Sequence, residues 1–108
     1  MPATTDLPEY LYLLRPGRLA MLTEGPTPEE AAIVSRHFAY LQALTEQGVM
    51  VLVGRTQNND ASTLGIAVFR AVDEAAARAI MEADPAVQHG VMTAQLFPFR
   101  IALLAQPA

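Results

Sequence analysis

Residues 49–70 read VMVLVGRTQNNDASTLGIAVFR and contain two apolar runs separated by a polar segment. The runs, Val49 to Val53 and Thr63 to Arg70, have the length and the flanking turn residues typical of β-strands. The segment between them, Thr56 to Ser62, is rich in Asn, Asp and Ser, which favour turns. We therefore predict an antiparallel hairpin at the centre of the chain.

A helix is predicted on each side of this hairpin. Residues 27–30 (TPEE) combine a capping threonine, a proline at the first helical position and a glutamate that completes a capping box. This helix is expected to run to about Gln47, where a glycine follows that can end it. The second helix is predicted from Glu74 to Ala83, with Asp73 as its cap and Pro85 as its stop.

Strands are predicted towards both ends of the chain. Glu9 to Leu14 (EYLYLL) is expected to be a strand buried on both faces. Arg18 to Pro26 is expected to be an irregular lead-in to the first helix, with room for one helical turn. Val91 to Phe97 is expected to form a strand that Pro98 ends, and Phe99 to Leu104 an extra C-terminal strand. The order β-α-β-β-α-β predicts an α+β fold of the ferredoxin-like, split βαβ type.

The length and composition suggest a partner. The 108 residues are enough for one small domain, spanning residues 1–108 with a core at about 9–104 and short flexible termini. The chain is 52% hydrophobic and only 17% charged, where about a quarter is usual. Because the helices of this fold cover one sheet face and leave the other bare, we expect a homodimer closed sheet against sheet, a dimeric αβ-barrel.

The composition also argues against several functions. The net charge of −4 argues against binding of nucleic-acid phosphates. There is no cysteine and no lysine, which excludes thiolate and Schiff-base chemistry. No phosphate-binding or dinucleotide motif is present, so no cofactor is indicated. No apolar run reaches the roughly 20 residues that cross a membrane, and the first residues lack the features of a secretory signal, so we expect a cytoplasmic protein.

His37 is the first candidate for chemistry. It shares one face of the first predicted helix with apolar residues that include Val34 and Leu41, three and four positions away. One interpretation is a core histidine whose ring nitrogens are bonded to backbone or water. The other is a general acid/base tuned by burial and a carboxylate.

Asp84 is the second candidate, and it follows the second predicted helix. A carboxylate at a helix C-terminus meets the negative end of the helix dipole, which suggests a role beyond solvation, such as orienting a histidine. The other histidine, His89, is expected at the surface. The two histidines lack any metal-ligand spacing, and no metal site is predicted.

Other polar and aromatic residues are less specific. Asp60 and the neighbouring asparagines are expected to form the hairpin turn. Arg15, Arg18 and Arg55 stand at strand or loop ends, where they could meet an anionic substrate or simply be surface charges. The aromatic residues are expected mainly in the core, with one or two available to wall a pocket for a flat ring; they are Tyr10, Tyr12, Tyr40, Phe38, Phe69, Phe97 and Phe99.

Several short segments follow one another in a characteristic order along the chain. They are YLYLL at 10–14, RHFAYL at 36–41, EQG at 46–48, GRT at 54–56, GIAVF at 65–69, ADP at 83–85, GV at 90–91 and FPF at 97–99. Their ordered combination resembles the YCII-related family of small bacterial proteins. The resemblance implies a ferredoxin-like αβ-barrel dimer with a histidine–aspartate pair in a pocket. By position, that pair is His37 and Asp84.

Two hypotheses about function follow. The few members of this family with known chemistry resemble lyases or isomerases of small cyclic compounds, including a dehydrochlorinase acting on a chlorinated hydroxyhydroquinone. The first hypothesis is therefore a cofactor-independent enzyme in which His37 transfers a proton and Asp84 orients the imidazole. The alternative is a non-catalytic dimeric module that binds a metabolite or a partner protein.

Overall fold

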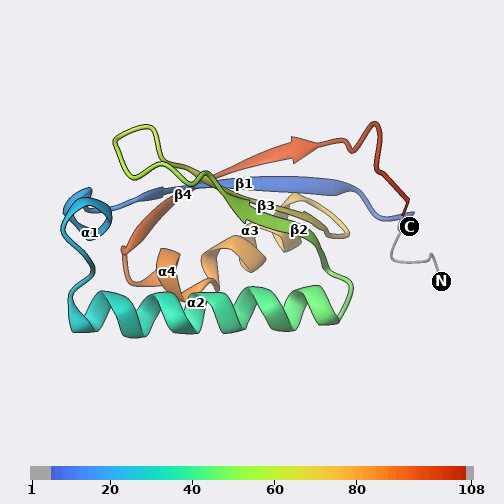
Figure 1. Cartoon of the computed structure of the whole chain (residues 1–108). Coiled ribbons are helices and arrows are strands. Elements are labelled where there is room, and N and C mark those ends of the chain that lie inside the picture. The colour runs from blue at the N-terminus through green and yellow to red at the C-terminus, as the bar shows by residue number, and fades with distance from the viewer. Residues whose placement is uncertain (1–5, 107–108) are drawn as a thin grey trace.

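The computed structural model describes residues 6–106 and shows an α+β fold of the ferredoxin-like type. The elements are β1 (Glu9–Pro16), α1 (Ala20–Thr23), α2 (Pro28–Glu46), β2 (Met50–Arg55), β3 (Gly65–Arg70), α3 (Glu74–Glu82), α4 (Pro85–Gln88) and β4 (Met92–Phe99). The strands form one antiparallel sheet in the order β2-β3-β1-β4. The helices α2, α3 and α4 lie on one face of that sheet (Figure 1). The predicted fold class and order of elements are confirmed. The termini predicted to be flexible lie largely outside the described residues.

The central strand β1 separates the two faces of the sheet. Tyr10, Tyr12 and Leu14 are buried on the helix side, whereas Leu11 and Leu13 are half-buried on the other side. The alternation follows from the two-residue period of a strand. The prediction that this strand is buried on both faces is therefore wrong for a single chain, because the described residues leave the second face without a covering layer.

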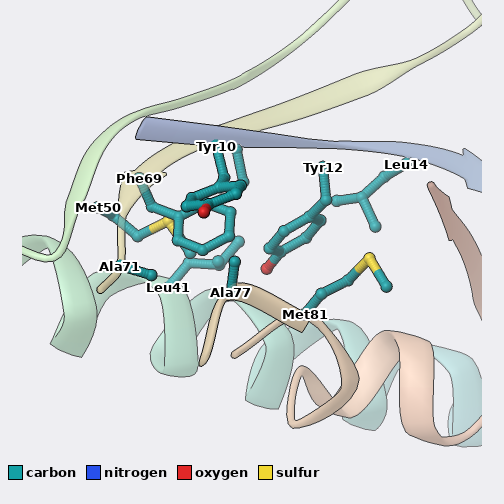
Figure 2. Close-up of a cluster of buried hydrophobic side chains, with 10 residues drawn as sticks. Tyr10, Tyr12, Leu14, Leu41, Met50, Phe69, Ala71, Ala77 and Met81 are labelled. Atoms are coloured by element: carbon teal, nitrogen blue, oxygen red, sulfur yellow. The ribbon is translucent and has the colours of Figure 1, made fainter. Parts of the chain in front are cut away.

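The main core fills the space between the sheet and the helices. Tyr12 and Phe69 are fully buried, with their ring centroids 5.6 Å apart in an edge-to-face arrangement. Leu41 from α2 and Met81 from α3 pack against them (Figure 2). The hydroxyl of Tyr12 points away from the sheet towards the helices, and this direction places it next to the candidate site (Figure 2).

The C-terminal strand differs from its prediction. The strand β4 continues through Pro98 to Phe99, and residues 100–106 form no further strand. Proline is tolerated here because β4 lies at the sheet edge, where a missing N–H need not interrupt the ladder. Beyond Phe99 the backbone N–H of Ile101 donates to the carboxylate of Glu9 at 2.9 Å, a side-chain contact in place of a ladder bond.

The N-terminus of α2 is built as its sequence predicts. The Thr27 hydroxyl accepts the Glu30 N–H at 3.1 Å, and the Glu30 carboxylate accepts the Thr27 N–H at 2.8 Å. Arg18 adds two further hydrogen bonds to Glu30, of 3.0 and 2.6 Å, and so connects the segment before α1 to this helix.

No helix in the part of the chain that the structure describes is long and apolar enough to cross a membrane.

We expect the Glu30 contacts to make stability depend on acid pH. The hydrogen bonds from Arg18 and then from Thr27 lower the pKa of Glu30 from 4.5 to about 2. Because the folded-state pKa is depressed, the contribution is complete above about pH 4.5 and is lost as the pH falls towards 2. Urea unfolding of the wild type and Glu30→Gln should give a free-energy difference that shrinks over this range. Glu29→Gln, on the same helical turn, is the control, and a pH-independent difference for Glu30→Gln would contradict the prediction.

Candidate active site

Three hydrogen bonds converge on the fully buried carboxylate of Asp84. The Tyr12 hydroxyl donates to Oδ2 at 2.8 Å, and the backbone N–H of Ala86 donates to Oδ1 at 3.0 Å. Nδ1 of His37 lies 2.7 Å from Oδ1. The structure thus brings the two candidate residues into direct contact and adds Tyr12 to them.

Each member of this group is held by a different element. Tyr12 lies in the middle of β1, His37 in the middle of α2, and Asp84 between α3 and α4. Asp84 directly follows Ala83, the C-cap of α3, as the sequence predicts, but it is also the N-cap of α4, which the sequence did not reveal. In that position its acceptance of the Ala86 N–H is favourable.

The hydrogen-bond pattern determines where the protons lie. Burial, the charge of Asp84 and the hydrogen bond to it all raise the pKa of Tyr12 well above its usual value, so the phenol remains protonated and donates. A carboxylate only accepts hydrogen bonds, so the bonded Nδ1 of His37 carries a proton. In the neutral imidazole this leaves Nε2 with the free lone pair, and Nε2 has no hydrogen-bond partner among residues 6–106.

The His37 ring forms part of the wall of a cavity of about 370 Å³. Its side chain is 12% exposed, so it is reachable from the cavity although Asp84 behind it is not. The apolar part of the wall includes Val34 and Phe38 from α2 and Met21 from α1. Arg55, at the end of β2, adds a charged side chain to the wall. The cavity lies within the range of small-molecule sites.

The remaining candidates are divided between this cavity and the surface. His89 is exposed, as predicted, and its Nε2 accepts from Arg36 at 3.3 Å. Arg18 is paired with Glu30, whereas Arg15 and Arg55 line the cavity. Within the described residues, no group of three or more His, Asp and Glu side chains is placed to hold a metal ion.

The aromatic residues are less buried than predicted. Phe97 and Phe99 are exposed on the sheet face away from the helices, and Phe38 on α2 is 66% exposed. Phe38 is one of the cavity-lining residues, so it is the aromatic side chain available to contact a flat ligand.

The role of Tyr12 was missed at the level of sequence, where it was assigned to the core with the other aromatic residues. A usable signal exists, because a tyrosine at the centre of a buried strand needs a hydrogen-bond partner for its hydroxyl. Nothing in the sequence identifies that partner, since Asp84 is 72 positions away.

We expect Tyr12→Phe to lower the free energy of unfolding by about 1–3 kcal/mol, because it leaves Oδ2 of buried Asp84 without its donor. Tyr10→Phe is the matched control, since the Tyr10 hydroxyl has no hydrogen-bond partner in residues 6–106. Chemical denaturation of both variants measures the difference. Equal stability of the two variants would show that the Tyr12–Asp84 bond contributes nothing.

Comparison with known proteins assigns the chain to a family. Its fold resembles that of 5-chloro-2-hydroxyhydroquinone dehydrochlorinase from Burkholderia phenoliruptrix, solved in complex with 2,5-dihydroxybenzoquinone, with a TM-score of 0.60. The two share 16% identity, over 84% of this chain and 93% of that one. No functionally curated protein has significant similarity to the chain. The family model of the YCII-related domain matches residues 10–100, and the chain therefore belongs to the YCII-related family.

Proposed function

We propose that this protein is a cofactor-independent lyase or isomerase that acts on a small cyclic substrate by proton transfer. The observation that supports this best is the hydrogen-bonded chain from Tyr12 through Asp84 to His37, which ends at the wall of the cavity. In many enzymes a buried carboxylate that accepts hydrogen bonds on both oxygens orients a neighbouring histidine, and that histidine acts as the general acid/base.

The three side chains have separate roles in this proposal. Nε2 of His37 takes a proton from a substrate carbon or hydroxyl and returns it to the product or leaving group. Asp84 holds the ring with Nδ1 protonated and stabilises the imidazolium that forms. Tyr12 is a positioning residue, because its hydroxyl bonds Asp84 and is buried away from the cavity.

The structural neighbour supports the same kind of chemistry. That protein is a dehydrochlorinase, and its structure holds a dihydroxybenzoquinone, a flat six-membered ring. A cavity of about 370 Å³ with mainly apolar walls suits a single ring of this size. Removal of HCl from a ring needs a base for the proton and no redox partner, which is within the reach of a histidine–aspartate pair.

A panel assay tests the proposal. Hydroxylated, halogenated and lactone ring compounds are incubated with the protein in D₂O, and NMR follows deuterium incorporation and elimination. We expect catalysis of exchange or elimination for at least one compound. The control His89→Gln removes the exposed histidine and should behave as wild type. Compounds that shift the His37 ring signals without exchange or turnover would instead support the alternative, a non-catalytic binding module.

We further propose that the protein is a homodimer closed sheet against sheet. The sheet face opposite the helices carries half-buried Leu11 and Leu13 and the exposed side chains of Leu52, Phe97 and Phe99. An apolar surface that extends over β1, β2 and β4 is typical of an interface. In Figure 1 no helix formed by residues 6–106 covers this face.

We expect Leu13→Asp to weaken the dimer by roughly 100-fold or more, because a carboxylate would be buried without a partner at the centre of the interface. Sedimentation velocity over a concentration series measures this. Val72→Asp is the control, since Val72 is exposed between β3 and α3, away from the sheet face. A wild type that stays monomeric at micromolar concentration would rule out the dimer.

A further inference from the structure

Arg55 is the last residue of β2 and extends on the helix side of the sheet. It is opposite Gly65 of β3, which in turn is opposite Leu14 of β1, a residue buried on the helix side. This register places the Arg55 side chain on the same face of the sheet as the cavity, and Arg55 lines that cavity together with His37.

The Arg55 guanidinium is held in place by neutral oxygens. Its Nε donates to the Thr56 carbonyl and its Nη2 to the Asn59 side-chain oxygen, both at 2.9 Å. The loop that carries Asn59 is itself cross-linked, because Thr63 donates to the Asn58 carbonyl and accepts the Asp60 N–H. The guanidinium is therefore positioned before any ligand arrives.

Arg55 forms no ion pair within residues 6–106, whereas Arg18, Arg70 and Arg78 each pair with a glutamate. Of its five N–H groups, those on Nη1 have no acceptor in this part of the chain. A positioned guanidinium with free donors is a receptor for a carboxylate, which accepts two of them at once.

The cavity lining carries basic side chains although the chain is acidic. Its lining residues include Arg15 and Arg55 but no aspartate or glutamate. The chain carries a net charge of −4, so this local excess of positive charge runs against the composition. The rest of the wall is largely apolar, which suits a hydrocarbon ring.

We infer that the cavity takes a small cyclic carboxylate, with the anionic group on Arg55 and the ring between Phe38 and the apolar wall. Arg55 is in this inference a specificity-determining residue. The inference rests on the proposed function for the role of His37, but the recognition of the anion needs only the cavity and Arg55.

The test compares two planar probes of equal size, benzoate and the neutral benzamide, by titration of ¹⁵N-labelled protein. We expect benzoate to bind about 10- to 100-fold more tightly, because charge-assisted hydrogen bonds are worth that much over neutral ones. The Arg55 Nε–H signal should shift on binding. The preference should be lost in Arg55→Gln, be intermediate in Arg55→Lys, and remain in Arg78→Gln, which changes the net charge equally at an exposed site on α3.

The outcomes separate this inference from the proposed catalysis. Equal affinity for the two probes, no binding of benzoate, or an undiminished preference in folded Arg55→Gln would each overturn it. If the preference depends on Arg55 while no ring compound is turned over, the anion site stands and the catalytic proposal fails. If only neutral compounds are turned over and benzoate is not preferred, the catalytic proposal stands and the anion site fails.

Discussion

Replacing Asp84 by alanine is expected to lower the free energy of unfolding by about 3–5 kcal/mol. The change removes the acceptor of the buried Tyr12 hydroxyl and of the Ala86 N–H, and it takes away the partner of His37 Nδ1. Each buried donor without an acceptor costs about 1–3 kcal/mol, and loss of an N-cap about 0.5–2 kcal/mol. Because domains are stable by only about 5–15 kcal/mol, the variant should unfold at markedly lower denaturant concentration.

A second aspartate provides the control for this prediction. Asp73 caps α3 by accepting the Ala76 N–H at 2.8 Å, as Asp84 caps α4, but Asp73 is exposed. Asp73→Ala should therefore cost only the capping contribution, about 1 kcal/mol. The difference between the two variants measures the contacts with Tyr12 and His37. If both cost the same, the buried network does not stabilise the fold.

Replacing His37 by glutamine is expected to lower kcat/KM by about 10²- to 10⁴-fold with any substrate that the panel identifies. Glutamine has polar atoms able to bond Asp84 but cannot take up or release a proton at the cavity wall. The loss should fall mainly on kcat, because the apolar wall and Arg55 that hold the ligand are unchanged.

Steady-state kinetics of His37→Gln beside His89→Gln measure this effect. The His89 variant loses an exposed imidazole that contacts Arg36 and should keep wild-type rates. Benzoate binding to His37→Gln shows whether the cavity is still formed. A variant that binds benzoate and retains full activity would remove His37 from the mechanism.

The secondary structure was largely predictable because its signals are local. The capping box at Thr27 and Glu30, the cap Asp73 and the turn residues around Asp60 each act within a few positions. The helix α2 follows this prediction closely and runs from Pro28 to Glu46.

The errors arise where a neighbouring element decides the outcome. Pro98 was expected to end a strand, yet β4 continues through it because this strand has a partner on one side only. Asp84 was assigned to the end of one helix because α4, of four residues, is too short to show a periodic pattern.

The sequence alone determined the order and type of the elements and, through the side chains facing inward on α2, drew attention to His37. It also drew attention to Asp84, although for a reason that the structure corrects. Only the tertiary structure decided that these residues touch each other and Tyr12, and that Arg55 lines the same cavity and forms no ion pair among the residues that the structure describes. The physical reason is distance along the chain: caps and periodicity act within one or two turns, whereas the site joins residues 47 and 72 positions apart, which only the packing of helices on the sheet brings together.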